Sequence, residues 1–245
     1  MNIYREESEQ ELPALCLFDN GREVQTPFGT YYLIEKELAL DEGQINTQIP
    51  MSAGGNLRSL VGVITEERPN PSTLDDMLFL DIESTGLQPR QPLFLVGLLF
   101  RRDGQYRLKQ YLARRPAEEK ALLSGITEVV QEFGSVVTYN GRNFDIPYIE
   151  TRMAKYNLPY SSPQCHIDLL WFARRHYRAH LPNCRLATLE EHVLNMKREG
   201  DIPGHRIPDA YNRFIRTQEP GRMLDILEHN ALDLISLRRL LFLAG

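Results

Sequence analysis

Four carboxylates and one histidine are the residues whose types and spacing could do chemistry in this sequence. Asp81 and Glu83 end an apolar stretch, Asp145 follows an Asn-Gly pair, and Asp233 lies four residues after His229. Two-metal phosphodiester hydrolysis needs such acids to hold two cations about 3.5–4 Å apart, where they activate water and stabilise the leaving oxygen. The set therefore predicts a metal-dependent nuclease site.

Each of these residues also has an ordinary structural explanation. Strand alternation would put Asp81 and Glu83 on one face, either as oxygen ligands of a hard divalent cation or as the acidic end of a strand at the surface. Asp145 precedes an expected helix, which it could simply cap. His229 and Asp233 share a helical face, where the histidine either positions the attacking water or bonds only to its neighbour.

The elements that must position these residues are those of an α/β domain with a mixed β-sheet flanked by helices. Alternating or continuous apolar stretches predict strands, and apolar spacing of three to four residues predicts helices. The expected strands are Met77–Ile82, Leu93–Phe100, Tyr106–Leu112 and Ser135–Tyr139, with a hairpin turn at Arg101–Gly104. The expected helices are Pro116–Phe133, Ile146–Tyr156, His166–His180, Thr188–Leu194 (with Thr188 as N-cap) and Met223–Leu243, and Ile202–Pro208 is expected to be a loop.

The segment before this domain predicts a small β-containing appendage. Val24–Leu40 contains a Pro-Phe-Gly turn between β-favouring residues, which indicates a short strand or hairpin. Residues 50–56 are expected to form a loop, 57–65 a short element and 67–76 a linker rich in proline and polar residues. We therefore expect an appendage over residues 1–70 and a catalytic domain over residues 71–245.

Composition narrows the class of protein. With 42% hydrophobic and 25% charged residues, the chain has the balance of a soluble globular protein. Three separated cysteines without a CxxC pair favour a reducing cytoplasm, and no apolar stretch is long enough to span a membrane. The net charge of −5 is the sum of −8 in residues 1–75 and +3 in residues 76–245. Two bound divalent cations would make the latter region more positive, as a nucleic-acid partner requires.

Three motifs carry a resemblance to a known family. LFLDIESTGL, TYNGRNFDIPYI and EHNALDLISL resemble the exonuclease motifs of the DEDD group in the ribonuclease H-like superfamily. CRLATLEEHVLNMKREGDIPGHRIPDAYNRF and the upstream TPFGTYYLIEKEL resemble the YprB-like family of that superfamily. The resemblance covers roughly residues 20–242, and the combination is more specific than any single motif.

The resemblance implies a ribonuclease H-like fold and a 3′–5′ exonuclease acting on single-stranded DNA or RNA with two Mg²⁺ or Mn²⁺ ions. By position, Asp81, Glu83, Asp145 and Asp233 match the metal-binding acids. His229 matches the water-orienting position, although it lies four residues before Asp233 where the histidine subtype has five. The alternatives are an endonuclease with the same acids and a binding module with a weak site.

Substrate contacts are expected on the two loops beside the acids. The resemblance implies that Thr85, Gly86 and Leu87 meet the 3′-terminal nucleotide, and that Asn140 and Phe144 line the same groove. For Leu87 and Phe144 the alternative is an ordinary place in the core.

Two basic groups and one cysteine–histidine group remain open. The basic groups either follow a phosphate backbone or form solvated faces. They are Arg101, Arg102, Arg107, Lys109, Arg114 and Arg115, and then Arg174, Arg175, Arg178 and Arg185. A structural zinc site is a weaker alternative, because its candidates lack the usual paired spacing. These candidates are Cys165, His166, His176, His180 and Cys184.

Overall fold

A seven-stranded mixed sheet with helices on both faces forms the core of the chain. The computed structural model describes residues 21–40 and 73–244. The strand order is β1-β2-β5-β4-β3-β6-β7, antiparallel from β1 to β3 and parallel from β3 to β7. The strands are β1 Gly21–Thr26, β2 Gly29–Leu38, β3 Met77–Ser84, β4 Leu93–Arg102, β5 Gln105–Leu112, β6 Ser135–Thr138 and β7 Cys165–Asp168. The α-helices are α2 Glu119–Gln131, α3 Asp145–Lys155, α4 Leu169–Tyr177, α5 Leu186–His192, α6 Ile207–Thr217 and α7 Gly221–Ala244, and short 3-10 helices are Leu74–Asp76, Pro116–Glu118 and Gly204–Arg206. The α/β prediction is confirmed.

The N-terminal hairpin extends this sheet. At its turn, the Thr26 hydroxyl accepts from the Phe28 N–H and donates to the Gly29 carbonyl, while Gly29 has a φ of 112°. The second strand of the hairpin pairs with β5 from Tyr32 to Leu38. The hairpin expected within Val24–Leu40 is thus confirmed, whereas the elements expected over residues 50–65 lie outside the described residues.

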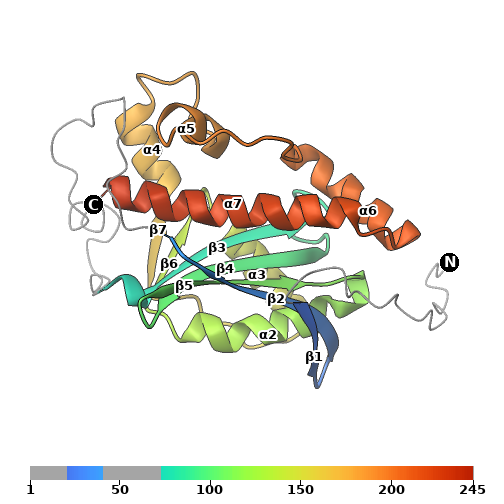
Figure 1. Cartoon of the computed structure of the whole chain (residues 1–245). Helices are drawn as coiled ribbons and strands as arrows, with labels where there is room; N and C mark the ends of the chain where they lie inside the picture. Colours follow the sequence, from blue (N-terminus) through green and yellow to red (C-terminus); the bar gives the residue numbers. More distant parts are fainter. Residues whose placement is uncertain (1–20, 41–72, 245) are drawn as a thin grey trace.

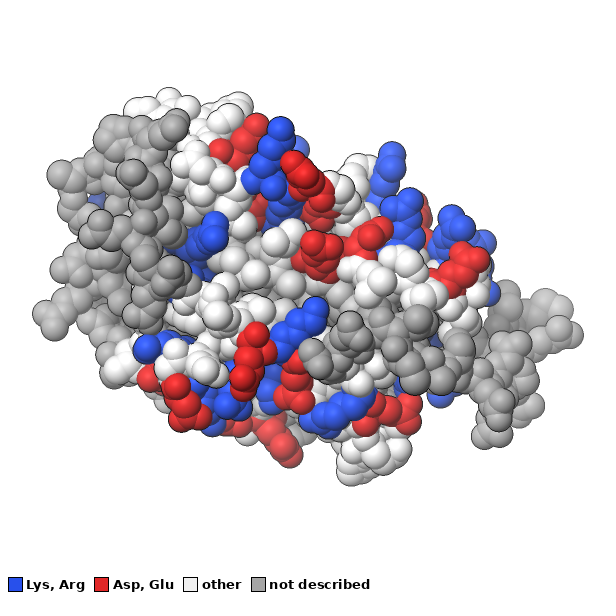
Figure 2. All heavy atoms as spheres, in the orientation of Figure 1, with Lys and Arg blue, Asp and Glu red and all other residues white. Residues whose placement is uncertain are grey.

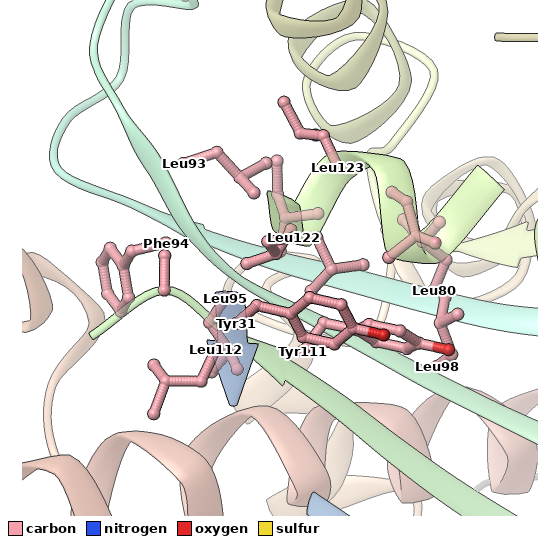
Figure 3. Close-up of a cluster of buried hydrophobic side chains, with 14 of the residues drawn as sticks. Tyr31, Leu80, Leu93, Phe94, Leu95, Leu98, Tyr111, Leu112, Leu122 and Leu123 are labelled. Carbon is pink, nitrogen blue, oxygen red and sulfur yellow. The ribbon is translucent and has the colours of Figure 1, made fainter. Parts of the chain in front are cut away.

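Strand β3 separates two cores because its side chains alternate between the faces of the sheet. Leu78, Leu80 and Ile82 pack on the side of α2 and α3, in the core whose centre Figure 3 shows. Met77 and Phe79 pack on the other side, with residues of α4 and α7. Asp81 and Glu83 continue the second series, so they lie on the face that α7 crosses (Figure 1).

Helix α7 reaches both cores in one continuous span. Its first turns place Met223 and Ile226 in the core that contains α2 and α3, and its second half places Leu234 and Leu237 in the other core. The expected helix Met223–Leu243 is confirmed. None of the helices in the described part of the chain has both the length and the apolar character that crossing a bilayer requires.

Three expectations about the elements after β6 were wrong. Residues 165–168 form β7 rather than the start of a helix, because main-chain pairing with β6 determines the structure of so short a segment. Helix α5 begins at Leu186, and the Thr188 hydroxyl donates to Asn183 Oδ1 at 2.7 Å instead of capping the helix. Helix α6 was missed and starts inside the expected loop, since a proline is compatible with the first turn of a helix.

A buried ion pair joins α2, α3 and the loop after β3. Arg152 and Glu119 are each 1% exposed, and Arg152 Nε donates to Glu119 Oε1 at 2.6 Å. Arg152 Nη1 also donates to the Arg90 carbonyl at 2.7 Å, and Glu119 Oε1 accepts from the Leu93 N–H at 2.8 Å. The network therefore fixes the second half of the loop that follows the β3 carboxylates.

Removing one partner of this pair should be strongly destabilising. We expect Arg152→Met to lower the free energy of unfolding by about 3–5 kcal/mol, because Glu119 would stay buried without its partner. The matched control is Arg102→Met, which breaks the half-exposed Arg102–Glu132 pair and should cost at most about 1 kcal/mol. Chemical denaturation measures both variants, and equal losses would contradict the assigned role.

Candidate active site

Three elements bring the four carboxylates together. Asp81 and Glu83 lie at the end of β3, Asp145 is the first residue of α3, and Asp233 lies in the middle of α7. Pairing between β3 and β6 ends at Phe79, and the N–H of Ile82, beyond that pairing, donates to the Asp145 carboxylate. The divergence of the two strands therefore makes room for Asp145 beside the β3 acids.

The electrostatics of the four acids are those of like charges placed out of water. Burial, followed by repulsion from Asp233 and Glu83, raises the pKa of Asp81 well above its ordinary value. Burial and repulsion from Asp233 and Asp145 do the same to the pKa of Glu83. Burial raises the pKa of Asp145 to about 7 even though two backbone N–H groups bond to it. Such a cluster is stable in its ionised form only with cations nearby.

Asn230 fixes the orientation of Asp81 from the opposite helix. Its Nδ2 donates to Asp81 Oδ2 at 2.8 Å, and its Oδ1 accepts from Gln110 Nε2 at 2.9 Å. Asp81, Gly97 and Gln110 are register partners on three neighbouring strands, so they form one row beneath α7. A Cβ atom at Gly97 would lie 2.1 Å from Asn230 Oδ1. The glycine thus allows the close approach of helix to sheet on which this contact depends.

His229 lies between the β3 acids and a fifth carboxylate. Its Nδ1 lies 2.9 Å from Asp201 Oδ1, while its Nε2 lies 4.0 Å from Glu83 Oε1 and 3.8 Å from Asp233 Oδ2. We assign the ring proton to Nδ1 because the carboxylate accepts it there. The lone pair of Nε2 then faces the carboxylates, where it can accept a hydrogen bond from water.

Arg198 supplies a positive charge at the edge of the cluster. Its guanidinium donates to Asp233 Oδ1, to Glu190 and, at 3.0 Å, to Asp201 Oδ2. Burial acts against the charged guanidinium, but its hydrogen bonds and attraction to Glu190 and Asp233 raise the pKa of Arg198. Burial still raises the pKa of Asp233, whereas the charge and the hydrogen bond of Arg198 act to lower it.

The donor set fits divalent cations. Among the described residues, no three His, Cys, Asp or Glu side chains already form a ready-made metal centre. The available oxygen atoms belong to buried or partly buried carboxylates with raised pKa values, and hard cations such as Mg²⁺ prefer oxygen ligands. Burial is the largest cause of the raised pKa values of Asp81, Glu83 and Asp145, so a cation would most favour the ionised form of these three acids.

The loop after β3 carries three of the expected substrate contacts. Thr85 donates through its N–H to the Pro92 carbonyl at 2.9 Å, and the Gly86 carbonyl accepts from the Tyr148 hydroxyl at 3.0 Å. Leu87 is 84% exposed, so the alternative that it belongs to the core is wrong. The loop is therefore held at both sides while Leu87 projects from it.

The loop before α3 carries the other two expected contacts. Asn140 is exposed in a left-handed conformation with a φ of 63°, and its N–H donates to Asp168 Oδ1 at 2.7 Å. Phe144 is half-buried, packs against the core and lies 5.4 Å from the Tyr148 ring. Tyr148 thus contacts both loops, and Asp168, which also caps α4 through the Leu170 N–H, anchors the second loop.

The first basic group is mostly neutralised by carboxylates. Arg102 pairs with Glu132 at 2.6 Å and Lys109 with Glu35 at 2.9 Å. Arg114 is buried and bonds to Glu118 at 2.7 Å. Figure 2 shows the same mixture of acidic and basic side chains over the lower part of the molecule. A paired face of this kind is not a continuous phosphate-binding surface.

The zinc alternative receives no support from the described residues. Cys165 is buried, and His166 Nε2 lies 2.8 Å from the Thr138 hydroxyl. Within residues 21–40 and 73–244, no cluster of three potential zinc ligands is present.

Sequence reasoning missed four polar residues around the carboxylates. Asn230 stands within the third motif, and Gly97, an isolated glycine in an apolar strand, is the signal that another element approaches closely there. Gln110 could be found only from the strand register. Arg198 and Asp201 belong to the KREGDIPG segment, and no local pattern links that loop to α7.

Comparison with known proteins supports the fold and the family. Uncharacterized protein YprB from Bacillus subtilis (strain 168) is 35% identical over 167 residues, which cover 66% of this chain and 40% of that protein. The family B DNA polymerase from the hyperthermophilic archaeon Pyrobaculum calidifontis shares the fold with a TM-score of 0.55 and 21% identity, over 73% of this chain and 25% of that one. A profile of the RNase H superfamily matches residues 78–244. Because that match covers most of the chain, the resemblance to the ribonuclease H-like superfamily is confirmed, and the chain belongs to that superfamily.

Proposed function

We propose that the protein is a metal-dependent nuclease that releases nucleotides from the 3′ end of single-stranded DNA or RNA. The observation that carries the proposal is the convergence of Asp81, Glu83, Asp145 and Asp233, from three elements, into one cluster with raised pKa values. Asp145 is buried in it, and the other three acids are partly buried. Burying this much like charge disfavours folding unless cations bind, so the cluster is best explained by its chemistry.

The proposed roles follow from the contacts of each group. Asp81, Glu83 and Asp233 would hold two Mg²⁺ or Mn²⁺ ions, and Asp145 would complete the site in part through water. The bound cations would supply an activated water and stabilise the leaving oxygen. His229 Nε2, with Nδ1 bonded to Asp201, would accept a hydrogen bond from that water and orient it.

The exposed Leu87 and the two loops joined through Tyr148 support action at a strand end. In this proposal Leu87 packs against the last base, and Thr85 and Gly86 contact the terminal nucleotide. Asn140 and Phe144 would line the other side of the groove. An apolar wedge and an aromatic ring are suited to unpaired bases, because every base has an apolar face on which to stack.

The central test is metal-dependent cleavage by the wild type and Asp81→Asn. With end-labelled DNA and RNA strands, the wild type should give a ladder of products with Mg²⁺ or Mn²⁺ and none with excess chelator. Asp81→Asn should lower the rate at least about 100-fold, because a metal ligand supplies several kcal/mol of transition-state stabilisation.

The matched control is Asp225→Asn, which changes a partly exposed acid of α7 that pairs with Arg222. Activity equal to wild type in Asp81→Asn would overturn the proposal, as would undiminished cleavage in chelator. Cleavage of a circular strand would indicate an endonuclease that uses the same acids, because a circle has no end at which an exonuclease could start.

The raised pKa values predict how stability depends on pH without metal. The folded protein holds the Asp145 proton up to a pH of about 7, against an ordinary value of 3.8. The folded state therefore binds more protons, and the free energy of unfolding in chelator should fall as pH rises from about 4 to about 7. Mg²⁺ should stabilise the protein more at pH 8 than at pH 5.

Asp145→Asn should flatten this profile, since the asparagine side chain does not ionise. Thermal or chemical unfolding across that pH range measures the effect. Stability that rises with pH over this range, or an equal effect of Mg²⁺ at both pH values, would contradict the assignment.

The row beneath α7 predicts a positioning role for Asn230. Gly97→Ala should displace the Asn230 amide and lower activity about 10- to 100-fold, as is typical when a partner of a metal ligand is lost. The Mg²⁺ concentration for half-maximal activity should rise in this variant and in Asn230→Ala. Gly221→Ala is the control, because an added Cβ there meets nothing within 4 Å. Unchanged metal dependence in both test variants would refute the role.

A further inference from the structure

One exposed face of α4 combines an aromatic ring with three arginines. Trp171, Arg174, Arg175 and Arg178 are exposed at spacings of three or four residues, so they share one side of the helix. The opposite side is buried in the core that also holds the second half of α7. The exposed face is therefore a continuous surface, which we name the α4 face.

The arginines of the α4 face differ from those of the strand hairpin. No carboxylate of residues 21–40 or 73–244 lies within ion-pair distance of Arg174, Arg175 or Arg178, whereas the hairpin arginines have acidic partners. Unpaired arginines at adjacent positions concentrate positive charge, and a polyanion complements it. Of the two basic groups, this one retains its charge for a ligand.

Trp171 gives the surface a stacking platform. It is the single tryptophan of the sequence and is 59% exposed. An exposed indole beside guanidinium groups is the combination with which proteins bind single strands, since bases stack on the ring and phosphates contact the arginines. Contact with solvent alone would explain exposed arginines on a helix, but it would not explain an exposed tryptophan beside them.

The α4 face begins beside the loop that leads to Asp145. Asp168, the N-cap of α4, accepts from the main-chain N–H groups of Asn140 at 2.7 Å and Arg142 at 3.1 Å. Strands β3, β6 and β7 are parallel, so the start of α4 lies at the same edge of the sheet as the β3 carboxylates. From Trp171 to Arg178, the residue directly after α4, the chain extends about 10 Å away from this edge.

We propose that the α4 face binds single-stranded nucleic acid and guides the strand between solvent and the carboxylate cluster. Trp171 stacks on a base, and Arg174, Arg175 and Arg178 contact successive phosphates. This inference rests on the proposed nuclease function only in stating that the strand leads to the carboxylate cluster. Its test does not depend on that function, because binding to the α4 face needs no hydrolysis.

The single tryptophan makes the first measurement direct. The full chain, kept in chelator, is titrated with 16-residue oligo-dT and with oligo-U while the tryptophan fluorescence is recorded. Stacking on Trp171 should quench the emission, and an abasic oligomer of the same length should not. Quenching by only one of the two polymers would assign the preferred nucleic acid and support the proposal.

Labelled-oligonucleotide anisotropy then tests the residues one class at a time. Trp171→Ala should weaken binding at least about fivefold, the lower limit for one stacked base. The triple variant R174A/R175A/R178A should lower the slope of log K against log salt by about 2, at about 0.7 per phosphate contact. The matched control R213A/R216A/R222A removes the same charge from exposed arginines of α6 and α7 and should keep the wild-type slope.

The outcomes separate this proposal from the proposed function. Absence of quenching, with unchanged affinity in both the Trp171 and the arginine variants, overturns the proposal even if the protein cleaves nucleic acid. A surface used by a protein partner would give that result. Equal quenching by the abasic oligomer overturns base stacking. A third outcome is quenching of the wild type and a reduced salt slope in the triple arginine variant, with no metal-dependent cleavage by the wild type. This outcome would support binding at the α4 face and refute the nuclease function.

Discussion

Repulsion among carboxylates that are buried or partly buried is the constraint on which the rest of this structure depends. Burial raises the pKa values of Asp81 and Glu83, and repulsion from Asp233 and Asp145 raises both of them further. A protein tolerates such a cluster only if surrounding contacts prevent the acids from moving apart. The sheet, α3 and α7 provide those contacts from three directions.

The side chains that bond directly to these carboxylates are neutral or positively charged and lie outside the cluster itself. Asn230 bonds to Asp81 and is held by Gln110, so the restraint extends into the centre of the sheet. Arg198 bonds to Asp233, and Asp201 holds His229. These groups hold the acids in place from outside the cluster. The negative charge in its interior therefore remains available to a cation.

Much of this site could be predicted from the sequence because it depends on local patterns. The apolar residues 77–80 before Asp81 and Glu83 predict the strand, and its alternation predicts their shared face. Helix α7 follows from its apolar spacing, and Asp145 from its place after an Asn-Gly turn. Each of these inferences uses fewer than about 20 neighbouring residues.

The remainder could not be predicted because it depends on contacts between distant segments. Strand β7 has four residues, too few for a strand period to be distinguished from a helical one. The roles of Gln110 and Gly97 exist only once the register of β3, β4 and β5 is known. Asp201 contacts His229 although 28 positions separate them in the sequence, and no rule of local spacing predicts such a contact.

The double anchoring of α7 also determines which changes of length the chain tolerates. Met223 and Ile226 lie in one core, Leu234 and Leu237 lie in the other, and Asp233 stands between these anchors. Each residue of a helix advances the side chains by about 100° around its axis. One residue inserted between the anchors would therefore either turn Asp233 away from the site or pull an apolar stripe out of its core. This helix therefore tolerates substitutions more readily than insertions or deletions.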